Sequence, residues 1–247
     1  MDASVSLLGR RILLPQRSDP GIAHALRGLG AIVDEVALIT RTPVPCAALD
    51  ELALDLRAGW YDWLAITSAF TVEALARLSH PLYSLIGPEI KIAAVGRATA
   101  AAVLACGGRV DLLPADGIGG AALAANWPAG PGRVAVPGAI DSADALPRML
   151  RERGWDVTSV GIYRTSPVAA LPAPIVAAWR GGEYDAFVVT SGSVAKAAAA
   201  LLSPTVPVVA IGTPSAQAAG RAGFRTVGIA RTTATNDLVT ALVAAVG

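Results

Sequence analysis

The chain contains the octapeptide YDWLAITS at residues 61–68 and nearly repeats it as YDAFVVTS at residues 184–191. Each copy opens with Tyr-Asp, continues as an unbroken apolar run and ends in Thr-Ser, which is typical of a buried strand followed by a capped helix. Flanking segments match as well, because RILLP at 11–15 returns as RVAVP at 133–137. We therefore predict one unit used twice, giving two similar lobes with a cleft between them.

Short apolar runs rich in β-branched residues alternate with Ala-rich segments of helical length in both halves. The predicted strands are Arg11–Leu14, Val33–Ile39, Trp63–Thr67, Ile90–Val95, Val110–Leu113, Arg133–Val136, Val157–Tyr163, Ala186–Thr190, Val206–Ile211 and Thr226–Ile229. The predicted helices are Ile22–Leu29, Ala47–Ala58, Thr71–Leu78, Thr99–Cys106, Ala143–Arg153, Pro174–Arg180, Ser193–Leu202, Ser215–Arg221 and Thr235–Val246. This alternation favours an α/β fold with two doubly wound parallel sheets, each covered by helices on both faces.

The composition indicates a globular protein whose own net charge is too small to attract a highly charged partner. Of the 247 residues, 53% are hydrophobic and 16% are charged, and the formal net charge is +1. These values exclude a disordered chain and provide no field for nucleic acid or an anionic membrane. Ala197–Gly220 carries no charge, but three prolines interrupt it, so we predict helix, strand and helix there instead of a membrane span. The two cysteines lack metal-ligand spacing and we see no signal peptide, so we expect a cytoplasmic protein.

Two runs, Val33–Thr40 and Val157–Thr165, are longer than the other predicted strands. Each starts apolar and ends in a polar segment that is followed by proline. A strand of this length can begin in one lobe and end in the other, so that the pair forms a two-stranded bridge. The alternative is an ordinary edge strand followed by a proline-marked loop, and the pattern alone does not decide between them.

Small polar residues follow the predicted strands, at the edge where a doubly wound sheet binds its ligands. Glycine allows close approach there, while free N–H groups and helix dipoles favour negative charge. We therefore predict an extended anionic ligand at this edge. The residues expected to line it are Arg17, Thr67, Ser68, Gly96, Thr99, Gly138, Ser191, Gly192, Ser193, Gly212, Thr213 and Ser215. For each serine or threonine, the alternative is a plain N-cap whose hydroxyl only closes its own helix.

Signals for metals and nucleotides are missing from the sequence. Neither His24 nor His80 has a cysteine or acidic partner at ligand spacing, and there is no dinucleotide fingerprint or Walker loop, so we expect no metal and no cofactor. Tyr163 stands out because it ends the predicted strand Val157–Tyr163, while its counterpart in the first half is Ile39. A tyrosine in this place either packs or reaches into the cleft as a hydrogen-bond donor and weak acid.

The order and spacing of these short motifs resemble the uroporphyrinogen-III synthase family over roughly residues 10–245. The motifs are the loop ending in Arg17, Asp62-x-x-x-x-Thr67-Ser68 followed by Val72-Glu73-Ala74-Leu75, Ala94-Val95-Gly96-x-x-Thr99-Ala100, Tyr163-x-Thr165, Asp185-x-x-x-x-Thr190-Ser191, and Ile211-Gly212. The resemblance implies two flavodoxin-like lobes joined by a two-stranded antiparallel ladder, with the chain crossing twice. The implied boundaries are residues 1–38 and 167–247 for lobe 1, 43–162 for lobe 2, and 39–42 and 163–166 for the ladder.

The resemblance also implies a cofactor-independent reaction. Hydroxymethylbilane, a linear polycarboxylate, would lose water and close to uroporphyrinogen III, with its last pyrrole ring inverted through a spiro intermediate. Tyr163 would assist departure of the hydroxymethyl oxygen, and Thr99 would be a second hydroxyl donor. The expected partners are this substrate and the enzyme that produces it, and the chain is expected to be a monomer. Pro214-Ser215 departs from the threonine pair that relatives often carry, and Pro214 removes one N–H donor.

Two further hypotheses belong to other classes. The first is a non-enzymatic two-lobed module that senses a small anion or a tetrapyrrole. The second is a phosphate-binding transferase with two similar lobes, although the sequence offers no general base for it. Product analysis with hydroxymethylbilane distinguishes an enzyme from a sensor.

Overall fold

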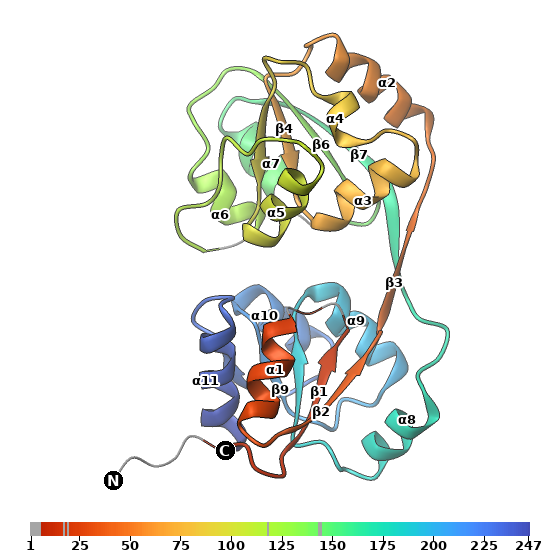
Figure 1. The fold of residues 1–247 in the computed structure, drawn as a ribbon, viewed down its shortest axis with the longest axis vertical. Coiled ribbons are helices and arrows are strands. Elements are labelled where there is room, and N and C mark those ends of the chain that lie inside the picture. The colour runs from red at the N-terminus through yellow and green to blue at the C-terminus, as the bar shows by residue number, and fades with distance from the viewer. Residues whose placement is uncertain (1–5, 17, 19, 118, 143–144) are drawn as a thin grey trace. The chain divides into compact units, whose positions relative to one another are not determined.

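The computed structural model forms two compact units, each built around one sheet (Figure 1). It describes residues 6–16, 18, 20–117, 119–142 and 145–247. The described residues of Met1–Thr40 and Ser166–Gly247 form lobe 1, and those of Arg41–Thr165 form lobe 2.

Lobe 1 is a five-stranded parallel sheet with the strand order β10-β9-β8-β1-β2. Its elements are β1 (Arg11–Pro15), α1 (Pro20–Gly28), β2 (Ile32–Val36), α8 (Ala173–Arg180), β8 (Ala186–Val189), α9 (Gly192–Leu201), β9 (Val208–Ala210), α10 (Thr213–Arg221), β10 (Thr226–Ile229) and α11 (Thr235–Val246). Taken from β2 to β10, this is the flavodoxin order 2-1-3-4-5. Ile12 and Leu14 enter the core on one face of the sheet and Leu13 enters the other, as the twofold period of a strand requires.

Lobe 2 repeats this plan around a sheet with the order β3-β7-β6-β4-β5. Its elements are α2 (Ala47–Arg57), β4 (Trp63–Ile66), α3 (Ala69–Arg77), α4 (Leu82–Leu85), β5 (Lys91–Ala94), α5 (Arg97–Ala105), α6 (Gly120–Ala125), β6 (Arg133–Ala139) and α7 (Leu146–Glu152). Two more strands of this sheet, β3 (Ile39–Pro43) and β7 (Asp156–Pro167), contain the positions at which the chain changes from one lobe to the other. An isolated bridge from Leu112 to Ala93 takes the place that β10 holds in lobe 1. Without β3, the two sheets therefore have the same strand order.

Each lobe combines strands from both halves of the sequence, because β1 pairs with β8 and β6 pairs with β4. The aspartate of each Tyr-Asp motif holds such a junction together. Asp185 Oδ2 accepts a hydrogen bond from the backbone N of Arg11 at 2.8 Å, and Asp62 Oδ2 accepts one from the backbone N of Arg133 at 2.7 Å. These equivalent contacts give a physical reason why the Tyr-Asp pair recurs.

The chain passes between the lobes in β3 and β7, which are antiparallel. The backbone N of Val168 donates to the carbonyl of Leu38 at 3.0 Å, and the backbone N of Val44 donates to the carbonyl of Ile162 at 2.8 Å. The two strands therefore run in opposite directions, because a later residue of one is bonded to an earlier residue of the other. The predicted fold class is therefore confirmed. One correction concerns Val33–Ile39, which breaks between β2 and β3 because Leu38 is buried in the lobe 1 core.

Other sequence predictions differ from the structure in length. Val110–Leu113 is reduced to the single bridge at Leu112, and helices α4 and α6 were not predicted because four and six residues are too short to show a helical period. The charge-free stretch forms α9, β9 and α10, as predicted. Among the described residues, every helix falls short of the length and apolar character that crossing a membrane requires.

Candidate functional site

The carboxyl ends of β6, β4 and β5 lie side by side in lobe 2, because these strands are parallel neighbours. This edge brings together Gly138 in β6, Thr67 and Ser68 after β4, and Gly96 after β5. A Cβ atom on Gly138 would lie 3.5 Å from the Thr67 hydroxyl oxygen, so these two residues adjoin. We call these residues, together with Thr99 and Tyr163, the lobe 2 edge.

The serines that follow β4 and β8 are helix caps. Ser68 Oγ accepts from the backbone N of Phe70 at 3.2 Å, and Ser191 Oγ accepts from Val194 at 3.3 Å. Gly96 and Gly212 cap α5 and α10 without a side chain, in an extended conformation. Both serines therefore act as N-caps of their own helices. A cap of this kind satisfies only one of several free N–H groups, so the remaining donors stay available to a ligand.

Electrostatics at these helix starts favour an anion. The helices α3, α5, α9 and α10 carry no acidic residue in their first turns, whereas α2 and α11 carry Asp50 and Asp237 there. The positive ends of the four helix dipoles are therefore not offset by their own side chains. Arg97 begins α5 and adds a full positive charge at an exposed position. The starts of α3 and α5 in lobe 2, and of α9 and α10 in lobe 1, can therefore attract carboxylate or phosphate groups.

Tyr163 lies within β7 and does not end it, because the strand continues to Pro167; this corrects the sequence prediction. Its side chain is only 5% exposed and belongs to the lobe 2 core. Phe70 packs against it edge to face, with ring centroids 4.9 Å apart and planes at 78°. Thr99, in the first turn of α5, is 6% exposed, and its hydroxyl has no hydrogen-bond partner among the described residues. Both proposed catalytic side chains are therefore largely buried in lobe 2.

The lobe 1 edge is formed where the neighbouring strands β8 and β9 end. The predicted residues found there are Ser191, Gly192, Ser193, Gly212, Thr213 and Ser215. Ser193 and Thr213 are exposed, while Ser215 is buried. Gly192 also has a packing role, because a Cβ atom there would lie 3.4 Å from Ala218 Cβ of the adjacent helix. Arg17 lies outside the described residues, and a single cleft bordered by all these residues stays a prediction.

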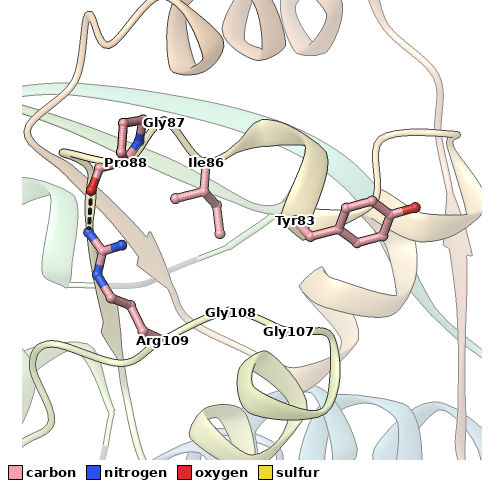
Figure 2. A pocket seen from close by; sticks show the side chains of 7 residues that line it. All are labelled: Tyr83, Ile86, Gly87, Pro88, Gly107, Gly108 and Arg109. Atoms are coloured by element: carbon pink, nitrogen blue, oxygen red, sulfur yellow. Dashed lines mark hydrogen bonds between the residues drawn. The ribbon is translucent and has the colours of Figure 1, made fainter.

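A surface pocket of about 240 Å³ lies at the opposite, amino-end edge of lobe 2 (Figure 2). It is lined by Tyr83, Ile86, Gly87, Pro88, Gly107, Gly108 and Arg109, none of which was predicted as a site residue. The Arg109 guanidinium donates to the carbonyls of Pro88 and Ile90 at 3.0 and 2.7 Å and to Asp111 at 3.2 Å. Because Nε and Nη2 bind groups on both sides of the pocket loop, we assign Arg109 to holding this loop.

The described residues contain no cluster of three or more His, Cys, Asp or Glu side chains suited to a metal ion. Sequence interpretation missed Phe70, which packs against Tyr163, and Gly161, which lies two residues before it in β7. The sequence does contain a signal for Phe70, namely that its equivalent in the other half, Ser193, is not aromatic. The same holds for Tyr163, whose equivalent is Ile39. Comparing the two halves for aromatic differences would have found the pair.

Comparisons with known proteins agree with this architecture. The family model described as "Uroporphyrinogen-III synthase HemD" matches residues 21–240. A mutant uroporphyrinogen III synthase from the extremely thermophilic bacterium Thermus thermophilus is 19% identical, with 96% of this chain and 98% of that chain covered and a TM-score of 0.61. The uroporphyrinogen-III synthetase of Helicobacter pylori is 16% identical, with 95% and 99% covered and a TM-score of 0.63. At these identities the likeness shows the fold alone. The search of curated proteins found no match.

Proposed function

This chain belongs to the uroporphyrinogen-III synthase family, and we propose that it catalyses the reaction for which the family is named. The substrate would be hydroxymethylbilane, and the product uroporphyrinogen III with its terminal pyrrole ring inverted. The match to the family over residues 21–240 carries this proposal. The proposal includes a monomer that acts in the cytoplasm on a bilane supplied by the preceding enzyme.

The acid-free helix starts at both edges support binding of a polycarboxylate. Backbone N–H groups beside Gly96 and Gly212 would hold carboxylates, because glycine leaves them open to close approach. The side chains of Arg17, Thr67, Ser193, Thr213 and Ser215 would add hydrogen bonds. Ser68 and Gly138 would contribute to binding at the edge of lobe 2, and Ser191 and Gly192 at the edge of lobe 1. A protein of nearly neutral charge can bind an anion in this way without a basic patch.

The Tyr163 hydroxyl would act as the acid that starts the reaction. It would give its proton to the hydroxymethyl oxygen while the carbon–oxygen bond breaks, so that water leaves and an azafulvene cation remains. The substituted carbon of the terminal ring would attack this cation to form a spiro intermediate. The older bond to that ring would then break and a new bond would form at the ring's other flanking carbon. Loss of the proton from that carbon to the phenolate would complete the product and restore Tyr163.

Control of conformation would account for product identity. The linear substrate also closes unaided to the uninverted isomer, so the protein must hold the rings where the spiro route is faster. The Thr99 hydroxyl, which has no partner among the described residues, would hydrogen-bond to the substrate near Tyr163.

The test is to incubate the protein with freshly generated hydroxymethylbilane and to separate the porphyrinogen isomers, with a protein-free reaction as the control. Isomer III in excess over isomer I is the expected result. Isomer I alone would refute the proposal. If tetrapyrrole binding were measured in that case, it would indicate the non-catalytic sensor.

A further inference from the structure

Tyr163 is held at an irregular point of the lobe 2 sheet. The pairing of β6 with β7 runs in register as far as Gly138 and Gly161, and then passes to Ala139 and Tyr163, so that Ile162 is skipped. Such a bulge changes the direction in which the following side chain points, and bulges are frequent beside active sites. The direction of the Tyr163 side chain therefore depends on this local geometry.

Gly161 makes the bulge possible because it has no side chain. A Cβ atom there would lie 2.8 Å from Ile140 Cγ1 and 2.9 Å from the backbone Cα of Ile140. A flexible side chain could move away, but a backbone atom could not unless the bulge itself shifted. Position 161 therefore has no room for a side chain, because Ile140 fills that space directly after Ala139, the pairing partner of Tyr163.

The same segment of β7 is held on both of its edges. The Tyr163 carbonyl accepts from the backbone N of Ile140 at 2.8 Å, and the Ile162 carbonyl accepts from Val44 at 2.8 Å. A change at Gly161 would therefore be passed to Tyr163 and could not be absorbed by a loose strand.

Phe70 restrains the ring from the side. It is 6% exposed, it meets the Tyr163 ring edge to face, and its backbone N is bound by the Ser68 cap. An edge-to-face pair of this kind has a defined geometry and is favourable beyond the burial of the two rings. Phe70 thus links the orientation of Tyr163 to the start of α3 at the lobe 2 edge.

We propose that Gly161 and Phe70 are positioning residues, which act through Tyr163 by fixing where its hydroxyl points. The inference rests on the proposed function, because it assigns to these residues a role in the same reaction. A displacement of about 1 Å in a reacting group can lower a rate about 10²-fold. Loss of either residue should therefore lower kcat and leave KM nearly unchanged.

The experiment compares Gly161→Ala with Gly108→Ala in the full chain. Gly108 is the control, because a Cβ atom there would also be crowded, at 2.8 Å from Val103 Cγ1 and 3.1 Å from the backbone O of Val103, but it lies at the amino-end edge. Both variants should lose stability to urea. Only Gly161→Ala should lower kcat for isomer III, by about 10-fold to 10²-fold.

A double-mutant cycle with Tyr163→Phe separates positioning from general damage. If Gly161 acts through the hydroxyl, Gly161→Ala should have little further effect on the rate once Tyr163→Phe is present. Phe70→Leu should behave in the same way, and Phe70→Tyr should retain most of the rate, which keeps the test decisive if Gly161→Ala does not fold.

Two results would overturn the inference while the proposed function stands. One is an equal loss of kcat in Gly161→Ala and Gly108→Ala. The other is a double variant whose loss of kcat equals the product of the losses in Gly161→Ala and Tyr163→Phe, since the two residues would then act independently. A native protein that yields no isomer III would instead overturn the proposed function itself, and the positioning roles with it.

Discussion

The carboxyl edges of the two lobes are built from the same parts, yet the aromatic pair of Tyr163 and Phe70 in lobe 2 has no aromatic counterpart at the equivalent positions of lobe 1. Ser68 and Ser191 cap equivalent helices, and glycine caps the next helix in each lobe. Where lobe 2 has Tyr163 and Phe70, the repeat places Ile39 and Ser193. We therefore propose that duplication supplied two similar frameworks for binding anions, and that the proton chemistry was added to one of them.

Removal of the Tyr163 hydroxyl tests this asymmetry most strongly. We expect Tyr163→Phe to lower kcat for isomer III by about 10²-fold, because general acid assistance contributes about 10²–10⁴-fold. The ring would keep its packing against Phe70, so unfolding by urea should change little. Single-turnover rates with fresh hydroxymethylbilane measure the effect, and an unchanged rate would remove Tyr163 from the mechanism.

The tyrosines that open the two octapeptides provide a second comparison. The Tyr184 hydroxyl donates to Asp34 Oδ2 at 2.8 Å, and Arg11 Nε donates to the same oxygen at 2.8 Å, whereas Tyr61 has no side-chain hydrogen bond among the described residues. Burial first, and then the hydrogen bond to Asp34, raise the pKa of Tyr184. The folded protein therefore keeps this proton at a pH where the unfolded chain has lost it.

It follows that the stability contributed by Tyr184 is complete below pH about 10, the ordinary pKa of tyrosine, and is lost as the pH rises towards the raised value. Tyr184→Phe should lower the free energy of unfolding by about 1.5 kcal/mol at neutral pH and should flatten its alkaline decline. Urea titrations at neutral pH and above pH about 10 measure both effects. Tyr61→Phe is the matched control, and an equal loss in the two variants would contradict the comparison.

The smallest expected effect concerns the first turns of α3 and α9. Thr71 is fully buried with its hydroxyl unpaired among the described residues, and Val194 occupies the equivalent position in the repeat. Thr71→Val keeps the shape and removes an unsatisfied polar group, so the free energy of unfolding should rise by about 0.5–1 kcal/mol. Denaturant unfolding checks this, with Val194→Thr expected to destabilise. A loss of stability in Thr71→Val would mean that the hydroxyl has a partner after all.

The main elements could be predicted because their signals are local. Thr226–Ile229 and Thr235–Val246 were predicted with the bounds that the structure shows, since each is a periodic segment between turn residues. The strand break before Ile39 could not be predicted in this way. It depends on Leu38 entering the lobe 1 core while β3 pairs with β7, and neither requirement is visible in the run itself.

The residue pattern alone is enough to predict that one α/β unit occurs twice, that small polar residues follow its strands, and that Tyr163 departs from the repeat. These features depend on periodicity and residue type, which can be read from residues that are neighbours in the sequence. The folded chain is needed to show that each lobe combines strands from both halves, that Gly161 has no room for a side chain, and that Phe70 packs against Tyr163. Those features arise from contacts between residues distant in the chain, where backbone space and ring orientation are fixed by packing.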